Sequence, residues 1–266
     1  MKIKAGLEYE ERGDGEVIYL VHAGVHSAWF ASLFEERALD GFRVIRVVRP
    51  GYGRSEPPSG HSFADHAWAC GRLLHELGVE RAFWVGHSSS CGIGLQLALD
   101  DPELVAGLVL YEPAKPSGRL REQASSTYVA PAMAAAARGD IPGAFDAFLR
   151  GVGGDGYREA LHKALGADGV DAAVRESTYF FAHEVPALRE WTFGAAEAGA
   201  VAAPALVARG AESPPWFEEN AAILAQLLPG AESVTVPGAD HLGPLTHPAE
   251  IASVIADFAR RRAGRS

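Results

Sequence analysis

The chain has 266 residues, of which 48% are hydrophobic and 22% are charged, so it suits one large α/β domain or one such domain with an insertion. Its net charge of -10 contains no run of like charge, which argues against nucleic acid as a partner because phosphate binding needs a basic face. Two cysteines, Cys70 and Cys91, suggest neither a disulfide framework nor a cysteine-based metal site.

The first residues lead directly into a strand pattern and do not form an apolar signal segment. No apolar stretch approaches the roughly 20 residues that cross a bilayer. We therefore expect a cytoplasmic protein that acts on a small molecule and does not bind a membrane. A homodimer is compatible with the sequence, which does not fix the oligomeric state.

The first half of the chain alternates between strand and helix patterns. Residues 2–10 predict an edge strand, and short apolar runs predict buried strands at residues 16–22, 42–48, 82–85 and 105–111. Helical periodicity lies between them, at residues 27–39, 62–77 and 90–99, with Ser62 as a suitable N-cap. Strands that alternate with helices indicate a parallel sheet.

The pattern changes after the strand that ends near residue 111. Residues 116–200 are alanine-rich and helical, without a convincing strand, whereas strand signals return at 204–208 and 232–236 and a closing helix at 248–262. We therefore predict a core of residues 1–115 and 201–266, interrupted by a helical cap of residues 116–200. Ligands of open α/β sheets bind at the carboxyl ends of the strands, so this cap would roof the site.

Residues 86–90 (Gly-His-Ser-Ser-Ser) follow a strand and open a helix, which makes Ser88 the candidate nucleophile. A sharp strand-to-helix turn exposes a serine hydroxyl at the edge of the sheet, and its usual pattern is G-x-S-x-G. Ser90 departs from that pattern, although it is still small enough for a tight turn. The alternative is a helix N-cap serine without a catalytic role.

His241 is the candidate base, because it follows the last predicted strand and fits the chain order serine, acid, histidine. Two acids compete. Glu112 ends an apolar strand, where an unpaired carboxylate is costly, and we favour it. Glu212 stands beside Ser213, which occupies the usual acid position after the seventh core strand. The alternatives are an ion pair with a cap arginine for Glu112 and a solvated loop charge for Glu212.

The backbone N–H groups of Ser89 and Gly24 are the candidate oxyanion donors, since one follows the nucleophile and the other lies in the loop after the strand at 16–22. Apolar and aromatic residues near the predicted site are the candidate substrate-binding residues: Val25, Trp29, Tyr128, Trp191 and Trp216. The cap aromatics equally suit the cap's own core.

The sequence predicts no metal and no cofactor. Histidines and carboxylates show no spacing typical of metal ligands. The glycines at residues 151–154 do not follow a strand, which disfavours a phosphate loop.

These segments together resemble the α/β-hydrolase fold of serine hydrolases over nearly the whole chain. The matching pieces are residues 22–24, 49–55, 86–90 and 238–241. The resemblance implies a mostly parallel sheet flanked by helices, with a helical cap after the sixth core strand. The Glu-Pro pair at 112–113 and the missing acid after the seventh strand resemble zearalenone-type lactonases, which place the acid after the sixth strand. Ala23, in place of the usual glycine, departs from the family pattern.

We therefore expect a serine hydrolase that cleaves a carboxylic ester or lactone of a small, largely hydrophobic substrate. Ser88, His241 and Glu112 would form the triad, and the reaction would pass through an acyl-enzyme. Two alternatives remain open on the sequence: a hydrolase of carbon–carbon bonds in diketones, and a ligand-binding protein that turns over poorly.

Overall fold

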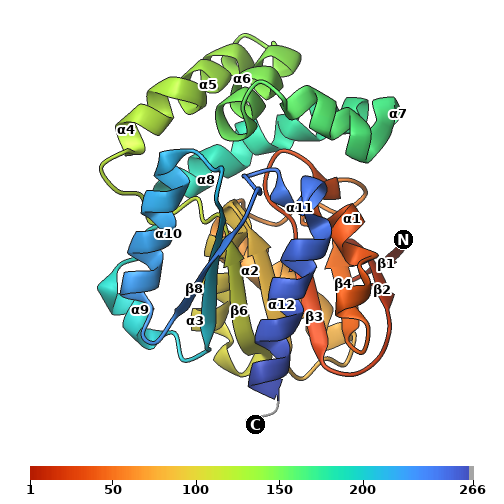
Figure 1. Ribbon diagram of the computed structural model, residues 1–266. Helices are drawn as coiled ribbons and strands as arrows, with labels where there is room; N and C mark the ends of the chain where they lie inside the picture. Colours follow the sequence, from red (N-terminus) through yellow and green to blue (C-terminus); the bar gives the residue numbers. More distant parts are fainter. Residues whose placement is uncertain (264–266) are drawn as a thin grey trace.

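A mostly parallel sheet forms the centre of the computed structural model, which describes residues 1–263 (Figure 1). The strand order is β1-β2-β4-β3-β5-β6-β7-β8. Strands β1 and β2 pair antiparallel and β3 to β8 run parallel, which confirms the predicted α/β class. The strands are β1 (Lys2–Lys4), β2 (Leu7–Arg12), β3 (Val17–Val21), β4 (Arg43–Val47), β5 (Ala82–His87), β6 (Val105–Tyr111), β7 (Ala205–Gly210) and β8 (Glu232–Val236).

Helices cover both faces of this sheet, which explains why its central strands are continuous apolar runs. In β3, Tyr19 and Val21 face one hydrophobic cluster, whereas Ile18 and Leu20 face the other. The first cluster includes side chains of α2 (Phe63–Glu76), α3 (Ser89–Asp100), α9 (Ala195–Ala200) and α10 (Pro215–Leu227). The second includes side chains of α1 (Ala31–Phe34) and α12 (Pro248–Ala263), and α12 crosses its face of the sheet in Figure 1.

Helix α2 begins where the sequence predicts, because Ser62 caps it. The Ser62 hydroxyl accepts from the Asp65 N–H at 3.1 Å, and the Asp65 carboxylate accepts from the Ser62 N–H at 3.0 Å. This reciprocal capping box satisfies two of the donors that a helix start leaves unpaired.

The prediction of a single helix at residues 27–39 is wrong. The chain there forms a 3₁₀ turn η1 (Ser27–Phe30), the short α1, and a second 3₁₀ turn η2 (Arg37–Leu39). The guanidinium of Arg12 donates to the carbonyls of Phe34 at 2.6 Å and Glu36 at 2.8 Å. Because a side chain from β2 takes these carbonyls, the helix ends early.

The segment between β6 and β7 is helical and lies over one end of the sheet, as Figure 1 shows. Within residues 112–204 the structure contains no strand. None of the helices in residues 1–263 has the length and apolar character needed to cross a membrane. Before α9, the elements are α4 (Arg121–Ala124), the π-helical turn η4 (Ser125–Val129), α5 (Ala130–Ala137), α6 (Ile141–Gly153), α7 (Tyr157–Tyr179), the π-helical turn η5 (Phe180–Glu184) and α8 (Val185–Glu190).

Backbone strain gathers where the strands end beneath this helical segment. Val25, Ser88 and Glu112 have φ angles of 74°, 57° and 53°, in the region that L-residues rarely adopt. They lie just after β3, β5 and β6. Strain of this kind costs on the order of 1–3 kcal/mol per residue and clusters at functional sites, so this edge of the sheet is the candidate site.

A glycine pair tests how tightly α3 packs on the sheet. A Cβ at Gly94 would lie 2.3 Å from Nε1 of Trp84, whereas a Cβ at Gly199 in α9 has no atom within 4 Å. We expect Gly94→Ala to lower the free energy of unfolding by about 1–3 kcal/mol, because the core must shift to accept the methyl group. Urea unfolding followed by tryptophan fluorescence measures the change.

Gly199→Ala is the matched control. It should leave stability unchanged or raise it by up to about 1 kcal/mol, since alanine favours a helix over glycine. Equal effects of the two substitutions would contradict the tight contact between α3 and β5.

Candidate active site

Ser88 occupies the turn between β5 and α3. Its φ and ψ are 57° and -116°, and its half-buried side chain borders a cavity beneath the helical segment. The Ser88 N–H donates to the Tyr111 carbonyl at 2.9 Å, while its carbonyl accepts from the N–H groups of Cys91 at 3.2 Å and Ala114 at 3.3 Å. The main chain on both sides thus fixes the strained turn, and a Cβ at Gly86 would lie 2.7 Å from the Ser90 carbonyl oxygen.

Ser90, which departs from the usual glycine, fits this turn without strain. It lies inside α3, and it is absent from the positive-φ positions. Its buried hydroxyl accepts from the His87 N–H at 2.8 Å and lies 2.6 Å from the Val21 carbonyl oxygen. The serine therefore replaces a glycine with a hydrogen-bonded link between the turn and the end of β3.

Glu112 follows β6 directly and His241 lies in the loop after β8, and their side chains are in contact. Glu112 Oε2 is 3.4 Å from His241 Nδ1, and both side chains are buried. Glu112 Oε1 accepts from the Gly210 N–H at 2.7 Å and from the Ser213 hydroxyl at 2.8 Å. Two donors thus hold one carboxylate oxygen and leave the other facing the imidazole.

Glu212, the alternative acid, points elsewhere. Its side chain is exposed, and its N–H donates to the Ala239 carbonyl at 2.9 Å. Ser213 occupies the usual acid position after β7, and its hydroxyl donates a hydrogen bond to Glu112.

Aromatic packing and a backbone contact position the imidazole of His241. The Phe217 ring stacks on it at a centroid distance of 4.1 Å, and the His87 ring lies 4.6 Å away. The Tyr111 hydroxyl donates to the Asp240 carbonyl at 2.6 Å, which anchors the loop. Burial, together with the neighbouring His241, holds the pKa of His87 well below its usual range, so the His87 ring is neutral.

The two expected oxyanion donors lie next to each other. Ser89 is the first residue of α3, so its N–H has no acceptor within the helix. The Gly24 N–H donates to the Ser89 hydroxyl at 3.2 Å. The sequence did not anticipate this contact, which occupies the second donor in the free protein.

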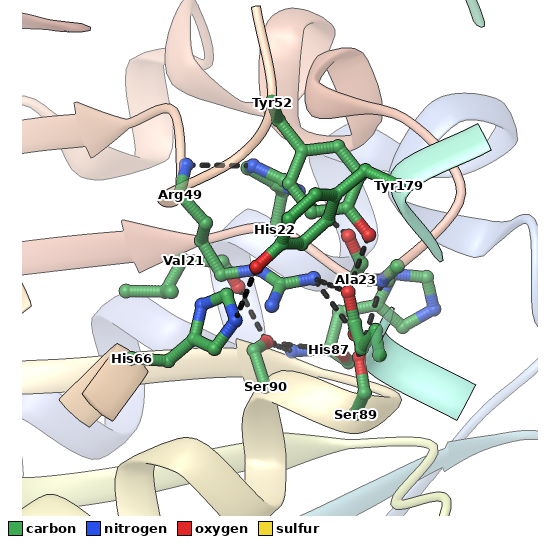
Figure 2. Close-up of polar contacts among 12 residues, drawn as sticks. Val21, His22, Ala23, Arg49, Tyr52, His66, His87, Ser89, Ser90 and Tyr179 are labelled. Carbon is green, nitrogen blue, oxygen red and sulfur yellow. Dashed lines mark hydrogen bonds and ion pairs between the residues drawn. The ribbon is translucent and has the colours of Figure 1, made fainter. Parts of the chain in front are cut away.

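A buried ion pair, missed by the sequence analysis, connects the helical segment to this loop. Arg49 Nη2 donates to both carboxylate oxygens of Glu184 at 2.9 Å, and both side chains are fully buried. The hydroxyls of Tyr52 and Ser89 also donate to Glu184. Figure 2 shows the side chains of Arg49, Tyr52 and Ser89 lying close together.

The ionisation of Glu184 follows from these contacts. Burial alone raises the pKa of the Glu184 carboxyl, but the Arg49 charge and the two hydroxyl donors outweigh it and leave the pKa below its usual value. The pair is therefore ionised at neutral pH. A charged residue within the apolar run of residues 180–185 was the available signal, since a buried carboxylate needs a partner.

His22 connects the loop after β3 to the loop after β4 through two backbone contacts. Its Nδ1 lies 2.6 Å from the Ala23 carbonyl oxygen, and its Nε2 accepts from the Arg49 N–H at 2.9 Å, which assigns the proton to Nδ1. Burial holds the pKa of His22 well below its usual range, so the ring is neutral.

The cavity beside Ser88 has a volume of about 160 Å³. Of the predicted substrate-binding residues, Tyr128 and Trp216 line it, together with Phe148, Phe180 and Phe217. Since cavities that take drug-sized ligands span roughly 300–1,000 Å³, this one suits a small molecule.

Val25, Trp29 and Trp191 were also predicted to bind substrate, and the cavity lining does not include them. Val25 is buried in the core. The Trp29 indole donates to the Gly24 carbonyl at 2.7 Å, and the Trp191 indole donates to Gln96 at 3.0 Å. Trp29 therefore supports the loop after β3, whereas Trp191 contacts helix α3.

A larger hollow of about 770 Å³ lies elsewhere, near the amino ends of the strands. Its walls include Glu16, Val17 and Arg43, and none of the candidate site residues borders it. Within residues 1–263, no three histidine, cysteine, aspartate or glutamate side chains group closely enough to hold a metal ion.

A parallel sheet with a strained serine turn, an acid–histidine pair at the same edge and helices above it defines the α/β-hydrolase class. A family model described as the alpha/beta hydrolase fold matches residues 16–248. The chain therefore belongs to this family, as the resemblance implied.

Individual relatives agree with this family. The enol-lactonase from Burkholderia xenovorans LB400 is similar in structure, with a TM-score of 0.78, 23% identity and 96% coverage of both chains. Est816, described as an N-acyl homoserine lactone degrading enzyme, has a TM-score of 0.70 and 25% identity, over 95% of this chain and 96% of its own.

Among curated sequences, a putative carbamate hydrolase RutD from Variovorax paradoxus is 37% identical over 109 residues, which are 39% of this chain and 41% of that protein. The chain spans less than half the length of the first curated relatives that it matches.

The buried ion pair gives a stability test. We expect Glu184→Leu to lower the free energy of unfolding by about 3–5 kcal/mol, because it leaves the Arg49 charge buried and uncompensated. The double variant Arg49→Met with Glu184→Leu should recover a large part of this loss, since both charges are then absent. Urea unfolding of the wild type, both single variants and the double variant measures the coupling.

Strictly additive effects of the two substitutions would contradict a direct interaction. The exposed pair of Arg158 and Asp146 is a comparison: Arg158→Met should change stability by about 1 kcal/mol or less.

Proposed function

We propose that this protein is a hydrolase of carboxylic esters or lactones that uses Ser88, His241 and Glu112 as its catalytic triad. The observation that carries the proposal is the arrangement at the sheet edge. A strained serine borders a small cavity, and a buried histidine–glutamate pair follows strands at the same edge. The triad is recognised by geometry and roles rather than by chain position.

The reaction proceeds in two steps. The Ser88 hydroxyl attacks the carbonyl carbon while His241 takes its proton, and the tetrahedral intermediate collapses to an acyl-enzyme as His241 protonates the leaving alkoxide. Water then attacks the acyl group, with His241 again as base, and releases the acid and free Ser88. Glu112 orients the imidazole through Nδ1 and stabilises its charged form.

The oxyanion is stabilised by the N–H groups of Ser89 and Gly24. In the free protein the Gly24 N–H donates to the Ser89 hydroxyl, so the developing oxyanion replaces that hydroxyl as acceptor. Glu184 keeps the Ser89 hydroxyl hydrogen-bonded during this exchange, because it is already its acceptor.

The substrate is small and largely hydrophobic. The cavity of about 160 Å³ is walled by Tyr128, Phe148 and Trp216, which suits one ring or a short acyl chain. The similarity to an enol-lactonase and to an N-acyl homoserine lactone degrading enzyme supports lactones beside simple esters. Carbon–carbon bond hydrolysis, cytoplasmic location and dimerisation stay predictions from the sequence.

The nucleophile is tested with an activated ester. We expect Ser88→Ala to lower kcat for p-nitrophenyl acetate by about 10³-fold or more, because the remaining oxyanion donors alone give little turnover. A fluorophosphonate probe should label the wild type and fail to label this variant, with Ser253→Ala as an exposed-serine control. Full activity of Ser88→Ala would refute the proposed mechanism.

The acid is tested by paired substitutions. Glu112→Gln should lower kcat by about 10³- to 10⁴-fold, since an amide cannot hold the imidazole in the correct tautomer or stabilise its charge. Glu212→Gln carries the same chemical change on an exposed side chain and should leave kcat nearly unchanged. Comparable losses in both variants, or none in Glu112→Gln, would count against Glu112 as the triad acid.

A further inference from the structure

The cavity beside Ser88 combines aromatic walls with positive charge. Lys115, Arg121 and Arg189 line it, and no aspartate or glutamate does. They come from three separate places: the loop after β6, the start of α4 and the end of α8. The chain as a whole carries 34 acidic against 24 basic side chains, so the local charge at this cavity is opposite to that of the molecule.

These cations have no anionic partner in the part of the chain that the structure describes. Neither Lys115, Arg121 nor Arg189 forms an ion pair with a carboxylate there. Glu219, which packs against the adjoining segment, accepts from the Leu120 N–H at 2.8 Å and pairs with Arg119 at 3.7 Å. The nearby acid is thus engaged outside the cavity.

Lys115 is held in place with a donor to spare. Its ammonium donates to the carbonyls of Arg189 at 3.1 Å and Trp191 at 2.7 Å, and an ammonium group has three donors. The side chain is half-buried, and burial, with the neighbouring Arg121 charge, lowers the pKa of Lys115. A bound anion would stabilise the charged ammonium of Lys115 and so offset both its burial and the repulsion from Arg121.

We propose that Lys115, Arg121 and Arg189 form an anion-binding end of the Ser88 cavity, and that the ester or lactone cleaved there carries a carboxylate remote from the scissile bond. The inference rests on the proposed function and narrows its substrate class. Arg121 and Arg189 are exposed where they line the cavity, so salt screens their attraction for a carboxylate. The same charges steer an anionic substrate to an otherwise acidic protein.

A matched substrate pair tests the catalytic consequence. The probes are p-nitrophenyl half-esters of dicarboxylic acids and the same compounds with the free carboxylate replaced by a carboxamide. We expect kcat/KM to be about tenfold higher for the carboxylates at low salt, with the difference shrinking as sodium chloride screens the charges. The double variant Arg121→Gln with Arg189→Gln should lose this preference.

Arg119→Gln is the matched control, because Arg119 is fully exposed, lies in the same segment and does not line the cavity. It should keep the carboxylate preference. A preference that survives in the double variant, or one that Arg119→Gln abolishes equally, would overturn the assignment to this cavity.

A binding measurement separates this inference from the proposed mechanism. Calorimetric titration of the Ser88→Ala protein with phenylbutyrate and phenylbutyramide should show about tenfold tighter binding of the acid, lost in the background of the double arginine variant. Equal binding of the two compounds, with esterase activity still dependent on Ser88, would refute the anion site and leave the proposed hydrolase intact. Selective binding of the acid, with esterase activity independent of Ser88, would support the anion site and refute the triad.

Discussion

The ion pair between Arg49 and Glu184 determines how the helical segment sits on the sheet. Two fully buried charges are costly unless they are paired, and η5 places Glu184 against Arg49 Nη2 just beyond the end of β4. The Nε and Nη1 atoms of Arg49 form no hydrogen bond within residues 1–263, so Glu184 is the partner on which this buried charge depends. The same carboxylate accepts from the Ser89 hydroxyl, which in turn accepts from the Gly24 N–H. The Arg49–Glu184 pair therefore fixes both the position of the helical segment and the geometry of the two N–H groups proposed to bind the oxyanion.

The positive φ angles of Ser88 and Glu112 are also maintained by contacts with neighbouring strands. Ser88 and Glu112 are each held in the left-handed region by backbone hydrogen bonds to neighbouring strands: the Ser88 N–H donates to Tyr111 and the Glu112 N–H donates to Ala208 at 2.8 Å. In a regular strand these side chains would point toward one face of the sheet. The strained conformations turn them toward the cavity and toward His241, and the buried sheet beneath supplies the stability that the strain removes.

Sequence reasoning reached the triad candidates because they depend on local order. Ser88, Glu112 and His241 each follow a recognisable strand, and parallel strands end at one edge, so chain position alone brings them near one another. The Arg49–Glu184 pair could not be predicted, because 135 positions separate the two residues and only the packing of the helical segment on the sheet brings them together. The cavity lining does not include Trp29 or Trp191; an indole suits a pocket wall or a core equally, and the sequence does not show its hydrogen-bond partner.

The width of the sheet supports the proposal that Glu112 is the acid. Glu112 leaves β6 and must reach a histidine that follows β8, with β7 between them. Neighbouring strands lie about 4.8 Å apart, so the carboxylate has to extend across one intervening strand. The Gly210 N–H at the end of β7 and the Ser213 hydroxyl beyond it both donate to Oε1. An acid after β7 would be one strand nearer to His241. An acid after β6 needs a longer side chain, and Glu112 has two donors from β7 and the loop beyond it that hold its carboxylate.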